Sequence, residues 1–90
     1  MFSIPRVNVV ESDAGFSIEV LGRVGMRYRE GDRSVLIDSE VLARKGISIA
    51  SKSIRFWEPG RQQVSEEEKE TIIHHIREAL AFRNEFLEVH

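Results

Sequence analysis

The chain has 90 residues, of which 41% are hydrophobic, and its 13 Lys and Arg against 15 Asp and Glu give a formal net charge of −2. This composition is typical of a soluble globular protein of one domain, residues 1–90, and the negative charge argues against a nucleic-acid partner, because non-specific binding needs a basic surface. The absence of cysteine excludes disulfides and thiolate metal ligands and agrees with a reducing compartment.

The chain begins with Met1 to Arg6, which lack the charged lead and apolar core of a signal peptide. No later stretch approaches the roughly 18 apolar residues that a membrane-spanning helix needs. We therefore expect a cytoplasmic protein that has no membrane segment.

Short β-rich segments occupy the chain from about residue 7 to residue 58. Apolar and polar residues alternate along them with a period of two, which predicts strands with one buried face. The predicted strands are residues 7–11, 16–21, 24–29, 35–37, 47–50 and 54–57. Gly31-Asp32 lies between two of them and indicates a two-residue hairpin turn, in which Glu30 would face Arg33. Residues 38–45 are predicted to form one irregular turn that Gly46 closes.

Residues from Ser65 to about Arg83 are predicted to form the one long helix. Ser65 and Glu68 have the spacing of a capping box, and glutamates in the first turn suit the positive end of the helix dipole. Five apolar residues fall within an arc of roughly 120° on one side. They are Ile72, Ile73, Ile76, Ala79 and Leu80.

A short strand is predicted at about residues 86–89, after the helix. Strands first, one late helix and a terminal strand predict an α+β fold. We expect an antiparallel β-meander that the single long C-terminal helix covers on one face. If the last strand lies parallel to the strand at residues 54–57, the crossover through the helix should be right-handed.

The predicted strand at residues 54–57 and the start of the helix supply the candidate partner-binding residues. Strand alternation places Trp57 beside Arg55 on the outward face, and Trp and Arg often anchor protein interfaces. Packing of Trp57 at a sheet edge is the alternative, because Trp is rarely exposed in full. The candidates are Arg55, Trp57, Glu58, Glu66 and Glu67.

No catalytic, metal or cofactor site is predicted. His74 and His75 point about 100° apart on a helix, so they cannot chelate one ion, and we expect both to be solvated. The sequence contains no nucleophile elbow, phosphate-binding loop or zinc-protease motif. The glutamates at positions 66–68 and 70 are explained by helix capping, with an acidic patch that faces a basic partner as the alternative.

Phe82 is the one large apolar residue that falls on the polar side of the helix. It is predicted to tuck against the chain end at Phe86 or Leu87. The alternative is an exposed aromatic side chain that is available to a partner.

Three segments resemble the immunity protein 74 family of bacterial polymorphic toxin systems, namely residues 28–34, 46–49 and 53–59. The helix, with its Ser65-to-Glu68 start and its Ile-Ile-x-x-Ile-x-x-Ala-Leu spacing, and the β-like tail are also similar to that family. The resemblance covers roughly residues 22–90. It implies an α+β fold, no catalysis, and a small cytoplasmic protein that binds and neutralises a cognate toxin domain. It brings no established functional residues.

A competing hypothesis follows from the residues alone. In it, the chain is a small nucleic-acid-binding or regulatory domain that uses the face carrying Arg55 and Trp57. It differs from the toxin-binding hypothesis in predicting sequence-tolerant, salt-sensitive binding of nucleic acid in a mobility assay at moderate salt.

Overall fold

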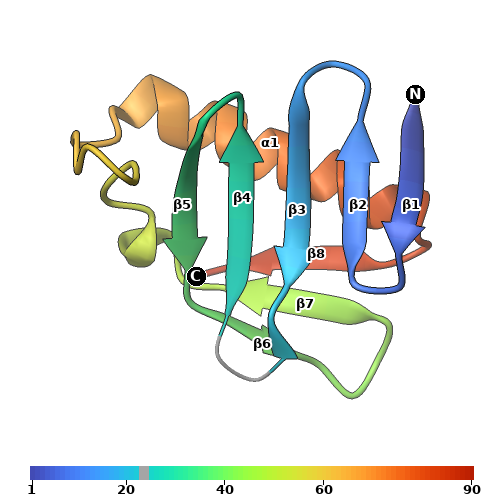
Figure 1. Cartoon of the computed structure of the whole chain (residues 1–90). Helices are drawn as coiled ribbons and strands as arrows, with labels where there is room; N and C mark the ends of the chain where they lie inside the picture. Colours follow the sequence, from blue (N-terminus) through green and yellow to red (C-terminus); the bar gives the residue numbers. More distant parts are fainter. Residues whose placement is uncertain (23–24) are drawn as a thin grey trace.

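The computed structural model describes residues 1–22 and 25–90, which form two β-sheets and one long α-helix (Figure 1). The five-stranded sheet is an antiparallel meander of β1 (Phe2–Arg6), β2 (Val9–Ser12), β3 (Phe16–Val20), β4 (Met26–Glu30) and β5 (Arg33–Ile37). The three-stranded sheet has the order β6 (Ser39–Val41), β7 (Gly46–Ile49) and β8 (Phe86–Val89). A 3-10 turn, η2 (Ser51–Ser53), and the helix α1 (Glu66–Phe82) lie between β7 and β8.

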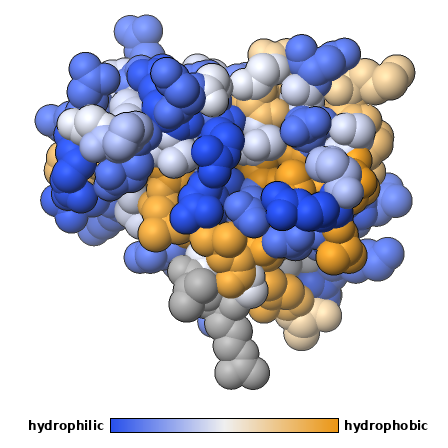
Figure 2. All heavy atoms as spheres, in the orientation of Figure 1, coloured by the Kyte–Doolittle hydropathy of each residue, from blue (hydrophilic) through white to orange (hydrophobic). Residues whose placement is uncertain are grey.

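The helix covers one face of the five-stranded sheet and leaves the other face open. In Figure 1, α1 passes behind this sheet, and the three-stranded sheet lies across the end at which β5 finishes. Figure 2 views the open face, on which hydrophilic residues gather toward the end where α1 begins. The predicted α+β fold, a β-meander covered on one face by a single C-terminal helix, is confirmed.

The helix start and the hairpin between β4 and β5 form as the sequence predicts. The Ser65 hydroxyl accepts from the Glu68 backbone N–H at 3.1 Å, and the Glu68 carboxylate accepts from the Ser65 N–H at 2.9 Å. This reciprocal pair is the predicted capping box. Glu30 faces Arg33 across the hairpin, and their charged groups lie 3.1 Å apart.

The N-terminal segment differs from the prediction, because strand structure begins at Phe2 and not near residue 7. β1 and β2 form a hairpin that turns at Val7 and Asn8. The Asn8 side chain donates to the Val20 carbonyl oxygen at 3.1 Å and so ties this turn to β3. Arg23 and Val24, which the prediction placed in a turn and a strand, lie outside the described residues.

Two other predictions for the middle of the chain are wrong. Residues 39–41 form β6 and pair with β7, so residues 38–45 are not one irregular turn. Residues 54–57 do not form a strand, and this part of the chain makes only isolated bridges, at Phe56 with Gln63 and at Glu58 with Ser34. The parallel partner of β8 is therefore β7. β7 is buried along its whole length, so it needs a partner on each edge for its backbone polar groups.

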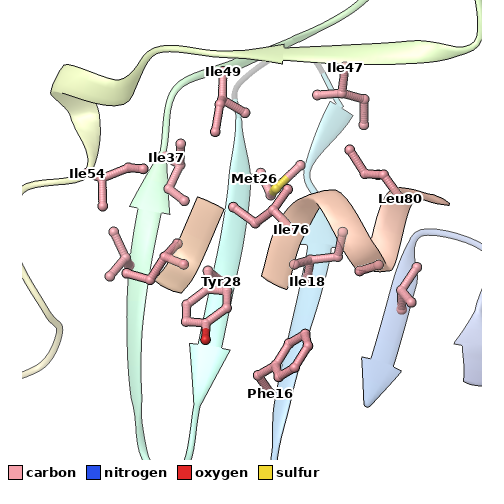
Figure 3. Packing of buried hydrophobic residues seen from close by; sticks show 14 of the residues in the cluster. Phe16, Ile18, Met26, Tyr28, Ile37, Ile47, Ile49, Ile54, Ile76 and Leu80 are labelled. Atoms are coloured by element: carbon pink, nitrogen blue, oxygen red, sulfur yellow. The ribbon is translucent and has the colours of Figure 1, made fainter. Parts of the chain in front are cut away.

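The core lies where α1, the inner face of the five-stranded sheet and β7 meet. Figure 3 shows Ile47 and Ile49 of β7 pointing toward the same space as side chains of the larger sheet and of α1. Of the five residues that the helical pattern places on the apolar face, Ile72, Ile76, Ala79 and Leu80 are fully buried and Ile73 is partly buried. Burial of each large one stabilises the fold by about 1.5–3 kcal/mol before the loss of conformational entropy is subtracted.

Phe82 was predicted to pack against Phe86 or Leu87, but the aromatic ring that packs beside it is that of Phe2. The Phe82 side chain remains 47% exposed, and its ring centroid lies 5.6 Å from that of Phe2 on β1. The Phe86 ring lies directly over Gly46, which is its neighbour across the parallel pair of β7 and β8. A side chain at position 46 would therefore displace the Phe86 ring.

We predict that Gly46→Ala destabilises the protein by about 1–3 kcal/mol, because the added Cβ would overlap the far end of the Phe86 ring and displace this ring from its place over β7. Urea unfolding followed by circular dichroism measures this change. Gly60→Ala is the matched control, because nothing lies within 4 Å of its added Cβ, and it should change stability by less than about 0.5 kcal/mol. Equal effects of the two variants would contradict the packing role of Gly46.

Candidate partner-binding site

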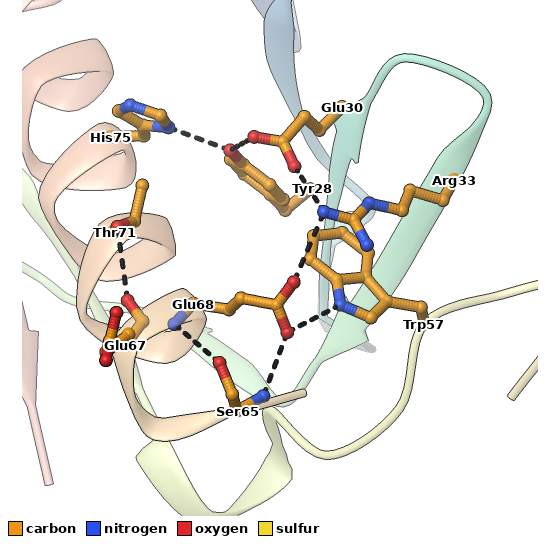
Figure 4. A network of polar contacts seen from close by, with 9 residues as sticks. All are labelled: Tyr28, Glu30, Arg33, Trp57, Ser65, Glu67, Glu68, Thr71 and His75. Atoms are coloured by element: carbon orange, nitrogen blue, oxygen red, sulfur yellow. Dashed lines mark hydrogen bonds and ion pairs between the residues drawn. The ribbon is translucent and has the colours of Figure 1, made fainter. Parts of the chain in front are cut away.

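A surface pocket of about 230 Å³ lies between the tip of the β4–β5 hairpin and the first turns of α1. We call it the helix-start pocket. Its walls include Glu30, Arg33, Trp57, Glu67, Glu68 and Thr71. Figure 4 shows Glu30 and Arg33 of the hairpin, Trp57 of the following loop and Glu68 of the helix pointing toward one another. The pocket therefore joins residues that are far apart in the sequence.

Arg33 is the cation at the centre of this pocket. Its Nη2 atom donates to Glu30 Oε1 at 3.1 Å and to Glu68 Oε2 at 3.3 Å. Its guanidinium carbon lies 3.7 Å from the centroid of the Trp57 ring, which is the geometry of a cation–π contact. The side chain remains 38% exposed, so Arg33 is held in one place while it still faces solvent.

Glu68 connects the cap of the helix to the pocket. Besides capping Ser65, its carboxylate accepts from the Trp57 indole N–H at 3.3 Å and pairs with Arg33. The hydrogen bond from the Ser65 backbone N–H, and after it the bond from Trp57, hold the pKa of Glu68 below its usual value. The carboxylate is therefore ionised at neutral pH, and it positions the start of the helix relative to the hairpin.

The same network continues inward from Glu30. The Tyr28 hydroxyl lies 3.4 Å from Glu30 Oε2 and 2.8 Å from His75 Nδ1. The His75 ring stacks on Phe16 at a centroid distance of 3.9 Å with an interplanar angle of 3°. Burial raises the pKa of Tyr28 and lowers the pKa of His75.

The prediction that both helix histidines are solvated is correct for His74 only. His74 is exposed and lies 3.5 Å from Glu78. His75 is partly buried between the helix and the sheet. The aromatic residues that enclose it come from β3 and β4, so no pattern within the helix could indicate its environment.

Trp57 lies inside the protein, and the prediction that it faces outward with Arg55 is wrong. Its side chain is only 3% exposed and forms part of the pocket wall under Arg33. The cause is local, because residues 54–57 are not a regular strand and so do not alternate. Ile54 and Trp57, three positions apart, are both buried, while Phe56 is half-buried.

Of the other four candidate partner-binding residues, only Glu67 lines the helix-start pocket, as Trp57 does. Glu66 is exposed on the first helical turn and lies 3.7 Å from Lys69. The Arg55 guanidinium lies 5.5 Å from the centroid of the Phe56 ring, and Arg61 lies 4.9 Å from the same centroid.

Glu58 is the last of the five candidate residues. It forms an ion pair with Arg61 at 3.3 Å, while its backbone bridges to Ser34 at the edge of β5. Arg55, Glu58 and Glu66 are thus not among the residues that line the pocket.

Sequence reasoning missed Arg33, Tyr28 and His75 as members of one site. The only local signal was the predicted pair of Glu30 with Arg33 in the hairpin.

Among the described residues, no three His, Cys, Asp or Glu side chains are arranged to hold a metal ion. Nor does the described part of the chain contain a helix with the length and apolar character needed to cross a membrane.

We predict that Arg33→Gln lowers the free energy of unfolding by about 1–2 kcal/mol, because it removes a cation–π contact and two partly exposed ion pairs. Arg29→Gln is the control, since Arg29 is exposed on the neighbouring strand and has no ion pair among the described residues. Urea unfolding of both variants measures the difference. If Arg29→Gln costs as much as Arg33→Gln, the pocket contacts do not stabilise the fold.

The lowered pKa of His75 predicts how stability depends on pH. The folded state disfavours the protonated ring, so the unfolded state takes up more protons as the pH falls below about 6.5. The free energy of unfolding should therefore decrease as the pH falls from neutral through the ordinary histidine pKa of about 6.5, which applies to the unfolded state, toward the lower pKa of His75 in the folded state. His75→Asn should reduce this slope. Chemical unfolding of both proteins at a series of pH values tests this, and equal slopes would contradict the burial of His75.

Comparison with known proteins places the chain in a family. The family model described as immunity protein 74 matches residues 17–89. A search of the curated proteins and a search of the solved structures found no match to the chain. The matched range contains all of the residues that line the helix-start pocket, together with α1 and the strands β4 to β8. The chain belongs to the immunity protein 74 family.

Proposed function

We propose that this chain is a non-catalytic immunity protein that binds a cognate toxin domain and neutralises it. The family match over residues 17–89 is the observation that carries the proposal. A protein of this kind protects the cell that makes the toxin, so the proposal includes a cytoplasmic location. Neutralisation would follow from occlusion of the active site of the toxin.

The surface around the helix-start pocket is the proposed interface. Glu66 and Glu67 are exposed on the first turn of α1, and Glu70 is exposed one turn further on. A toxin that acts on nucleic acid needs a basic cleft to hold phosphates. Acidic side chains on the immunity protein would attract such a cleft, and complementary charges mainly raise the rate of association.

Pre-organised side chains beside the acidic turn would provide the anchor for a stable complex. Trp57 is buried and contributes by supporting Arg33, whose exposed part is fixed by Glu30 and Glu68. Phe56 is half-buried and lies near the guanidinium groups of Arg55 and Arg61. Arginine and aromatic side chains that are already ordered lose little entropy on binding.

The competing nucleic-acid hypothesis is not supported by the position of Trp57. It requires an indole ring on which a base can stack, and this ring is 3% exposed. We therefore propose toxin binding alone.

The proposal predicts that a gene beside this one encodes the toxin, and that the double charge reversal Glu66→Lys with Glu67→Lys slows binding of that toxin domain. At low ionic strength the association rate should fall by at least about tenfold, and added salt should reduce the difference because it screens exposed charges. Surface plasmon resonance at two salt concentrations measures the rates. Glu68 is left unchanged in this variant, because it caps the helix.

The matched control is Glu11→Lys with Glu40→Lys, which makes the same change of charge at exposed positions on β2 and β6. An equal loss of rate in the control would show that only net charge matters. Unchanged binding by the Glu66 and Glu67 variant would exclude this surface as the interface. Failure of the wild-type protein to bind the toxin domain, or to protect cells that express it, would overturn the proposed function itself.

A further inference from the structure

We propose that Tyr28 and Glu30 form a hydrogen-bond relay through which protonation of His75 rearranges the helix-start pocket. The inference goes beyond toxin binding, and it concerns the state of the pocket in the free protein. It stands on the positions of three polar groups between α1 and β4 and on the connection of Glu30 to Arg33 (Figure 4).

The Tyr28 hydroxyl has one proton and two neighbours that can accept it. Nδ1 of His75 lies at 2.8 Å and Oε2 of Glu30 lies at 3.4 Å, so the shorter contact favours donation to a neutral imidazole. A protonated imidazole carries a hydrogen on both nitrogens and can only donate. Protonation of His75 therefore reverses its bond with Tyr28, and the tyrosine proton turns to Glu30.

Glu30 transmits this change to the pocket because its two oxygens face different partners. Oε2 faces Tyr28, and Oε1 accepts from Arg33 at 3.1 Å. A new donor at Oε2, together with the positive charge on His75, draws the carboxylate toward Tyr28 and weakens its hold on Arg33. Arg33 also contacts the indole ring of Trp57, so the indole environment changes with it.

The groups around His75 determine the pH at which this rearrangement occurs. Phe16 of β3 covers one face of the ring, and Glu30 is the charged residue that faces it from β4. His74 and Glu78 face it from its own helix. Burial lowers the pKa of His75 despite the two carboxylates, so the rearrangement is expected below the ordinary histidine value of about 6.5.

Nuclear magnetic resonance of the full chain tests the relay without any toxin, because Trp57 is the only tryptophan and its indole N–H gives a single resonance. The imidazole resonances of His74 and His75 are followed in the same titration from about pH 7.5 to about pH 5. We expect the indole resonance to shift with the midpoint of His75 and not with that of His74. His74→Gln is the matched control: the size of the indole shift should be kept, and its midpoint should still coincide with that of His75.

Tyr28→Phe separates the relay from a direct effect of charge. This variant removes only the hydroxyl group, so His75 should still titrate while the shift of the indole resonance is lost. The proposal is overturned if the indole resonance does not move while His75 titrates, if it follows His74, or if the shift persists in Tyr28→Phe. Since the measurement uses the free protein, each of these results leaves the toxin-binding proposal untouched.

Discussion

Burial of one apolar face of α1 is the constraint on which the rest of the structure depends. Ile72, Ile76 and Leu80 are buried in one cluster with residues of the five-stranded sheet and of β7, so both sheets pack against this helix. Neither sheet could bury its apolar face without the helix. The direction of α1 is fixed by this packing, and its acidic first turn is consequently placed beside the β4–β5 hairpin.

Glu68 joins stability to the proposed function, because one carboxylate satisfies the backbone of the helix start and orders the pocket. Its contacts with Ser65, Trp57 and Arg33 use both of its oxygens. Glu66 and Glu67 remain exposed on the same turn, since capping needs only the third glutamate. The first turn thus contains a structural carboxylate next to carboxylates that are available to a partner.

Local patterns in the sequence were sufficient for α1, for its capping box and for the β4–β5 hairpin, because each is stabilised by residues within a few positions of one another. They were insufficient for β6, whose three residues are too few to show a period and which forms because buried β7 needs an edge partner. Trp57 was misplaced for a related reason. Its orientation is set by Arg33 and Glu68, which lie on other elements.

The parallel pairing of β7 with β8 has a consequence for the order in which the chain can fold. Gly46 pairs with Phe86, so the second edge of β7 stays open until the ribosome has made β8, about 40 residues later in the sequence. The hydrophobic residues of β7 would meanwhile offer an unprotected strand edge, which is a site of misassembly in nascent chains. Rapid synthesis of α1 and β8, or a chaperone that shields β7, would therefore favour correct folding in the cell.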